Sequence, residues 1–131
     1  MRKLINQLLQ QGKLLRFTAV LATLLVVYLS LKSPDPESKP WSFFFIRGDL
    51  ILHFACYFTL AIIYYLALFN YEKTVQKALI LSILVGFTLE SMQLIQVFNR
   101  FFDLKDLLAN FFGSSVGIII IQFLFSHSIQ D

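Results

Sequence analysis

Six polar residues in an otherwise apolar stretch near the C-terminus have the types and spacing of a buried chemical site. The stretch FTLESMQLIQVFNRFFDLKDLLANFFGSSVG, residues 87–117, contains Glu90, Gln93, Arg100, Asp103, Asp106 and Asn110. A charged side chain in hydrocarbon costs several kcal/mol, so it persists there only beside a compensating partner. A carboxyl group held between burial and a neighbouring arginine can be poised to exchange protons near neutral pH, as general acid–base catalysis requires.

The polar residues recur at helical spacing on three segments of the chain. Steps of 4, 4, 3 and 4 residues join Ser82, Gly86, Glu90, Gln93 and Val97. Steps of 3, 4, 3 and 4 join Asp103, Asp106, Asn110, Gly113 and Gly117, and steps of 4 and 4 join Asp49, His53 and Tyr57. Each set lies on one face of an α-helix. Because polar groups avoid lipid, we expect the three faces to converge inside a helical bundle.

Some of these residues also have structural explanations. One of Asp103 and Asp106 is expected to cap the fourth helix, where a carboxylate accepts hydrogen bonds from free N–H groups. Asn110 suits a hydrogen bond between helices, and a histidine near a span end, such as His53, is usually interfacial. Glu90 has no cap to serve, since it lies about 12 Å inside a helix expected to end near residue 98. Glu90 is therefore the residue most expected to do chemistry, with Arg100 as its partner.

Glycines provide the expected helix contacts. Gly113 and Gly117 form a small-xxx-small pattern, whose usual role is close packing of two helices. We expect the fourth helix to pack there against the third, near Gly86.

The composition predicts a membrane protein of one domain, residues 1–131. Of its residues 57% are hydrophobic and only 15% are charged, whereas soluble domains carry about 25% charged residues. Apolar runs of spanning length occur at about 14–31, 50–69, 78–98 and 107–125, and all three prolines fall in the expected outer loop 32–49. The predicted fold is an all-α, four-helix transmembrane bundle. No stripe of basic residues with interleaved aromatics predicts nucleic-acid binding.

Basic residues predict that both termini are cytoplasmic. The first sixteen residues carry Arg2, Lys3, Lys13 and Arg16 with no acid, and the short loop after the second run carries Lys73 and Lys77. Basic loops stay inside. The first run resembles a signal peptide, but no Ala-x-Ala site follows it, so we expect an uncleaved anchor. The aromatic segment WSFFF, residues 41–45, then lies at the outer interface.

The polar pattern resembles that of the VanZ-like family over about residues 49 to 120. The resemblance rests on Asp49-x-x-x-His53, Glu90-x-x-Gln93, Arg100-x-x-Asp103-x-x-Asp106-x-x-x-Asn110-x-x-Gly113 and Gly117. The family often has lysine after the first aspartate, and glycine and a small polar residue around the arginine, where this chain has Leu50, Asn99 and Phe101. The resemblance implies a small multi-pass protein of the bacterial cytoplasmic membrane. The family's naming member is associated with teicoplanin resistance, and no reaction is implied.

Two functions follow as hypotheses. The first is a binding protein whose outward-facing cluster, including Asp49, Gln93, Asp103 and Asn110, takes a membrane lipid or a lipid-linked or anionic head group, with a link to teicoplanin tolerance. The alternative is an acid–base enzyme that uses Glu90, His53, Arg100 and Asp106 on a lipid-linked or phosphate-bearing envelope substrate.

No metal or other cofactor is predicted, although His53, Glu90 and Asp106 are competent ligands, because their spacing matches no strong metal motif. Transport would require a homo-oligomer, since four helices leave little room for a pathway.

Overall fold

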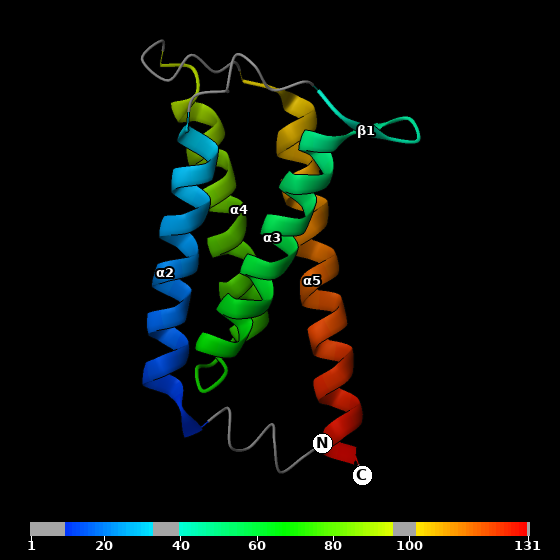
Figure 1. Cartoon of the computed structure of the whole chain (residues 1–131). Helices are drawn as coiled ribbons and strands as arrows, with labels where there is room; N and C mark the ends of the chain where they lie inside the picture. The colour runs from blue at the N-terminus through cyan, green and yellow to red at the C-terminus, as the bar shows by residue number, and fades with distance from the viewer. Residues whose placement is uncertain (1–9, 33–39, 96–101, 131) are drawn as a thin grey trace.

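A computed structural model of the chain shows four long helices that run alternately up and down (Figure 1). It describes residues 10–32, 40–95 and 102–130, with side chains up to residue 125. The helices are α2 (Gly12–Leu31), α3 (Gly48–Ala67), α4 (Thr74–Met92) and α5 (Leu104–Gln130). Each is long and apolar enough to cross a membrane. The predicted all-α fold with four membrane-length helices is therefore confirmed.

The predicted ends of the third and fourth spans were wrong. Helix α4 ends at Met92 rather than near residue 98, and α5 begins at Leu104 rather than near 107. After Met92 the chain continues in turns, in which the N–H groups of Leu94 and Ile95 donate to carbonyl oxygens three residues earlier. Hydropathy misplaced this end because the residues that follow it are still apolar. Glu90 consequently lies in the last turn of its helix, not about two turns inside it.

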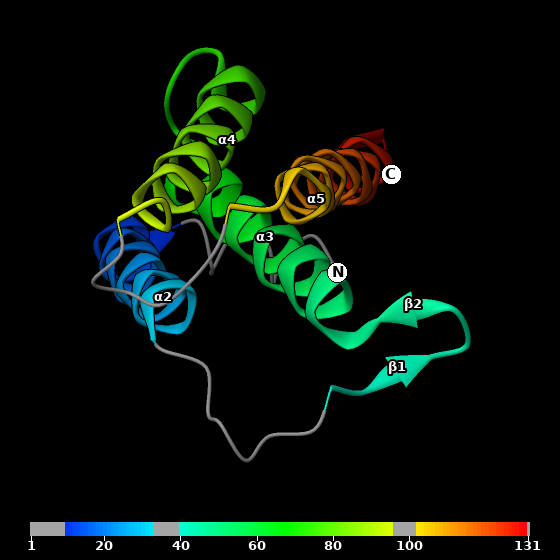
Figure 2. The ribbon, with the colours of Figure 1, turned by 90° about the horizontal axis from the view of Figure 1, so that it is seen from above.

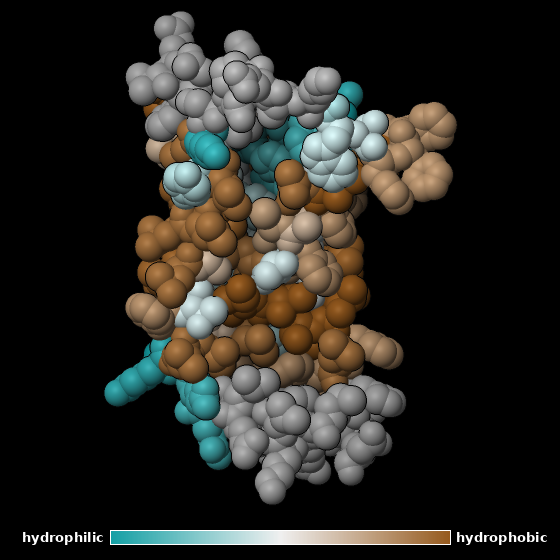
Figure 3. Space-filling model, viewed as in Figure 1, coloured by the Kyte–Doolittle hydropathy of each residue, from teal (hydrophilic) through white to brown (hydrophobic). Residues whose placement is uncertain are grey.

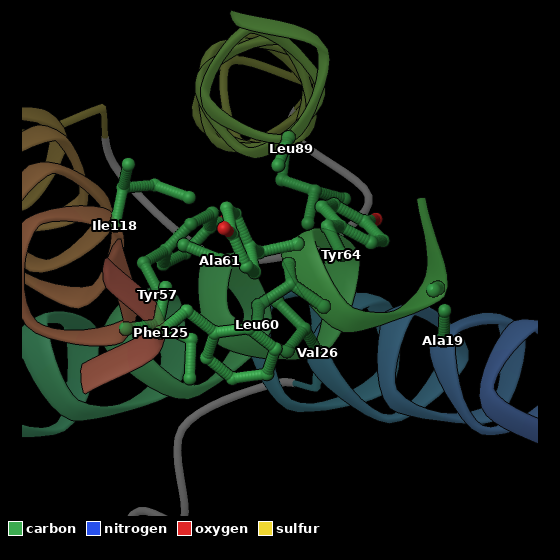
Figure 4. Packing of buried hydrophobic residues seen from close by; sticks show 13 residues of the cluster. Ala19, Val26, Tyr57, Leu60, Ala61, Tyr64, Leu89, Ile118 and Phe125 are labelled. Atoms are coloured by element: carbon green, nitrogen blue, oxygen red, sulfur yellow. The ribbon is translucent and has the colours of Figure 1, made fainter. Parts of the chain in front are cut away.

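Helix α3 is the central element and contacts the other three helices (Figure 2). Leu60 and Ala61 on α3 are almost fully buried. They share one apolar cluster with Val26 of α2, Leu89 of α4 and Ile118 of α5 (Figure 4). The outer faces of all four helices carry exposed apolar side chains, and on the face shown in Figure 3 they form a broad hydrophobic belt across the middle of the molecule. This arrangement is that of a bundle whose outer surface faces lipid.

Glycines of α5 allow its close approach to α3. A Cβ atom at Gly117 would lie 2.6 Å from the carbonyl oxygen of Phe58, and one at Gly113 would collide with the carbonyl oxygen of Phe54. The expectation that these glycines face the third span, which is α4, was wrong. They face α3, the second span, because the bundle places α3 on their side of α5. Gly86 of α4 does approach α5, as expected, because it lies against Asn110 as well as against Tyr57 of α3.

A short β-hairpin precedes α3 in the segment predicted as a loop. Strand β1 (Ser42–Phe43) pairs antiparallel with β2 (Ile46–Arg47). Phe44 and Phe45 form the tip and are 82% and 101% exposed. Isolated hairpins are marginally stable in water, and this one is anchored by the Trp41 ring, which packs where a Cβ at position 48 would lie. The hairpin brings Arg47 to the start of α3.

Candidate functional site

The polar faces of α3, α4 and α5 meet at the end of the bundle that carries the hairpin. The His53 ring lies between two carboxyl groups: its Nδ1 is 3.7 Å from Glu90 Oε1, and its Nε2 is 3.6 Å from Asp106 Oδ2. Nδ1 is also 3.0 Å from Asn110 Oδ1. We call His53, Glu90, Asp106 and Asn110 the polar cluster. Three helices contribute to it, as their spacing predicted.

The polar cluster is largely removed from solvent. Glu90 is 1% exposed, Asn110 2% and Asp106 8%. The amide nitrogen of Asn110 donates to Glu90 Oε1 over 3.4 Å, so its amide oxygen faces His53. Because that oxygen can only accept, the hydrogen of the neutral ring lies on Nδ1. Nε2 is then the nitrogen with a free lone pair, and it faces Asp106.

Three buried oxygens have no hydrogen-bond partner among the described residues. One is Glu90 Oε2 within the polar cluster, and the others are Tyr57 Oη and Ser114 Oγ beside it. Tyr57 lies one turn from His53 on α3, and Ser114 one turn from Asn110 on α5. An unsatisfied buried polar atom costs about 1–3 kcal/mol. Such atoms are rare in folded proteins, and each one requires a further partner or a structural explanation.

Arg47 connects a second set of carboxylates to the polar cluster. Its guanidinium pairs with Asp49, with Asp103 at 2.8 Å, and with Asp106 at 3.4 Å. Asp106 therefore faces both Arg47 and His53. Sequence reasoning missed Arg47, which it treated as an outer-loop residue. An arginine two residues before an aspartate at the start of a span was the available signal.

Hydrogen bonds and ion pairs shift the pKa values of two groups that lie outside the membrane-length segments, Arg47 and Asp103. The Asp49 and Asp103 carboxylates raise the pKa of the Arg47 guanidinium further above its usual high value. The backbone N–H of Lys105, followed by Arg47, holds the pKa of the Asp103 carboxyl below its usual range. Asp103 Oδ1 accepts that N–H at 2.8 Å, which makes Asp103 the N-cap of α5. Of the two aspartates considered as caps, Asp106 is therefore the one that faces the cluster.

The other candidate residues have different positions. Arg100 lies outside the described residues, as does Val97. Gln93 is buried, but its amide donates to the carbonyl oxygen of Ser30 at the end of α2, over 3.3 Å. The Arg47 guanidinium thus holds three carboxylates, of Asp49, Asp103 and Asp106, whereas Glu90 contacts His53 and Asn110.

A half-open groove between α2 and α3 begins at the polar cluster. Its first part, about 290 Å³, is lined by Asp49, His53 and Tyr57 and by apolar residues that include Val26, Leu29 and Cys56. A second part, about 330 Å³, shares Val26, Leu29 and Cys56 and continues towards Leu60 and Ile63. The space-filling view shows polar surface recessed at this end of the molecule, above the apolar belt (Figure 3). The groove is polar at one end and apolar along the rest of its length.

Four membrane-length helices around a buried polar cluster indicate a multi-pass membrane protein. The chain belongs to the VanZ/LLP1 family, whose family model matches residues 5–125. No curated protein and no solved structure matches it significantly.

Proposed function

We propose that this protein binds a membrane lipid in the groove between α2 and α3, with the lipid head group at the polar cluster. The observation that carries the proposal is the groove itself, whose lining changes from Asp49 and His53 at one end to mostly aliphatic side chains, with Thr59 among them, further along. An amphipathic ligand requires both kinds of surface in one continuous site.

The shape of the groove suits an acyl chain. Val26 and Leu29 of α2 form one wall, and Cys56 of α3 lies on the opposite wall in both parts of the groove. Both helices carry exposed apolar side chains, such as Leu25 and Leu52, which face the hydrocarbon of the bilayer. A lipid chain can therefore enter sideways from the bilayer without passing through water.

The head group would lie on the outer side of the bacterial cytoplasmic membrane. Arg16 and Lys77 both contact Tyr71 at the opposite end of the bundle: the guanidinium donates to the hydroxyl at 2.9 Å, and the ammonium lies 5.4 Å from the ring centre. Basic residues at the membrane surface favour the cytoplasmic side. This supports an outward-facing polar cluster, and with family membership it supports a role in tolerance to teicoplanin.

Photo-crosslinking tests lipid binding in the groove. The protein is reconstituted in phosphatidylethanolamine–phosphatidylglycerol vesicles that contain a phosphatidylglycerol with a diazirine in its acyl chain. Cross-links should concentrate on Val26 and Leu29, and Cys56→Phe, which fills the groove, should remove most of them. Leu84→Phe is the matched control, because Leu84 is 54% exposed on α4 and lies outside the groove lining. Even labelling of all lipid-facing residues, unaffected by Cys56→Phe, would contradict the proposal.

A second candidate function, acid–base catalysis on a lipid-linked substrate, is favoured by the position of His53 between Glu90 and Asp106. An imidazole held between two carboxyl groups can shuttle a proton. In a susceptible host made tolerant to teicoplanin by this protein, Glu90→Gln should abolish tolerance if the proton matters. Retention of tolerance at normal membrane levels of the variant would exclude acid–base chemistry at Glu90.

A further inference from the structure

We propose that His53, Glu90 and Asp106 bind one divalent transition-metal ion. The inference deepens the proposed function, because the ion would receive a phosphate oxygen of a lipid head group. Its own support comes from these three residues, from Asn110 and from the charges around Arg47, and it can be tested without any lipid.

The donor atoms are close enough to share an ion. One ligand atom from each residue lies within 4.8 Å of the others, and His53 Nε2 is 3.6 Å from Asp106 Oδ2. Ligands about 2.1 Å from a tetrahedral metal are roughly 3.4 Å apart. Two ligand atoms 4.8 Å apart would approach by about 1.4 Å to reach this separation, a change that small side-chain rotations supply.

Asn110 gives the histidine the orientation typical of a metal ligand. In metal sites the non-coordinating ring nitrogen usually donates to a carbonyl or carboxylate, which fixes the tautomer. Here Nδ1 is 3.0 Å from the amide oxygen of Asn110. Nε2 is left to coordinate, and its neighbour is the carboxylate of Asp106 at 3.6 Å.

Glu90 supplies an independent observation. Its side chain is 1% exposed, and its Oε2 has no hydrogen-bond partner among the described residues. Its other oxygen faces His53 and Asn110, so the carboxyl group is directed into the cluster. A buried carboxylate with an unsatisfied oxygen requires compensation, and a metal ion provides it.

The local charge balance also favours a cation. Arg47 pairs with Asp49, Asp103 and Asp106, so its single charge is already shared among three carboxylates, and Glu90 is not one of its partners. An anionic head group alone would be repelled by this excess of negative charge, whereas an ion of charge +2 would offset the excess. One imidazole and two carboxylates suit Zn²⁺ or Mn²⁺. Three protein ligands leave a coordination position for water or for a phosphate oxygen.

No local motif predicts this set because each ligand comes from a different helix. His53 is on α3, Glu90 on α4 and Asp106 on α5. The separations along the chain, 37 and 16 residues, are set by helix and loop lengths and not by the metal. The expectation from sequence was accordingly that no metal binds.

Metal titration of the purified protein tests the proposal. The full chain, purified in detergent with a tag that contains no histidine, is stripped with EDTA and titrated with Co²⁺, whose visible absorption reports ligand geometry, then with Zn²⁺ in competition. Wild type should bind one ion per chain. Glu90→Gln and His53→Gln should each weaken binding by about 100-fold or more. Glu72→Gln is the matched control, because it makes the same change at an exposed carboxylate in the turn between α3 and α4, at the opposite end of the bundle, and it should bind like wild type.

Equal binding by wild type, Glu90→Gln and His53→Gln would overturn the proposal, as would wild type that takes up no ion. Far-UV circular dichroism of the metal-free variants confirms that each is folded, and Asp106→Asn replaces either variant that is not. The result is separable from lipid binding: Cys56→Phe should lose the lipid cross-link and keep the metal. If the protein binds no metal ion but the lipid cross-link persists, the metal site is wrong and the lipid-binding proposal stands.

Discussion

Replacing Gly117 by alanine should separate α5 from α3 and destabilise the bundle. The new Cβ would lie 2.6 Å from the carbonyl oxygen of Phe58, and this oxygen belongs to helix backbone that cannot rotate away. The helices must therefore move apart by roughly 0.5–1 Å, which forfeits a quarter to a half of the dispersion energy of the contacts involved. Overpacking of this kind costs about 1–3 kcal/mol. Alanine recovers up to about 1 kcal/mol through its higher helix propensity, so the net loss should be about 1–2 kcal/mol.

Two other glycines calibrate this prediction. A Cβ at Gly12 would meet only the side chain of Asn70, at 3.9 Å, so Gly12→Ala should be neutral or slightly stabilising. A Cβ at Gly86 would lie 3.1 Å from a ring carbon of Tyr57, which is a side chain and can shift, so Gly86→Ala should fall between the other two. Unfolding free energies from SDS titration in detergent, followed by circular dichroism, give the order. A Gly117→Ala protein as stable as Gly12→Ala would refute the close approach of α5 to α3.

Three further predictions concern orientation and the hairpin end. In a Cys56→Ser background, a cysteine at Ser42 should react with impermeant thiol reagents in intact cells and one at Glu72 should not; the reverse would place the polar cluster on the cytoplasmic side. Arg47→Gln should leave its three carboxylates unpaired and lower the unfolding free energy by about 1 kcal/mol, a modest value because the guanidinium is half exposed; an unchanged SDS midpoint would show that the network contributes nothing. The pKa of Asp103 is lower in the folded protein than its unfolded value near 3.9, so its contribution to stability is complete above that pH and is lost as the pH falls through the folded pKa. Melting temperatures should therefore decline below about pH 4 in wild type, and less so in Asp103→Asn; parallel declines would contradict the assignment.

The orientation of α4 and α5 about their own axes could be predicted from the sequence. Ser82, Gly86 and Glu90 are all buried on α4, and Asp106, Asn110 and Gly113 on α5. This worked because a helix repeats every 3.6 residues, and lipid excludes polar side chains from the outer face. Hydropathy likewise located the four spans, since hydrocarbon thickness dictates the length of each apolar run.

The ends of the helices were harder to predict from the sequence, because they depend on capping residues and not on hydropathy. Asp103 caps the start of α5, because its carboxylate accepts a hydrogen bond from the N–H of Lys105. The end of α4 at Met92 was missed because the residues that follow it are also apolar.

Helix pairing, and with it the partners of each site residue, was decided only by the tertiary structure. Periodicity shows which face of α5 is polar, but not that α3 rather than α4 packs against Gly113 and Gly117. Nor does it show that a hairpin delivers Arg47 to Asp103, a residue 56 positions away. The physical reason is that local spacing reports only how one helix meets its surroundings. Contacts between helices depend on the packing of whole faces, and these bring His53, Glu90 and Asp106 within 4.8 Å of one another.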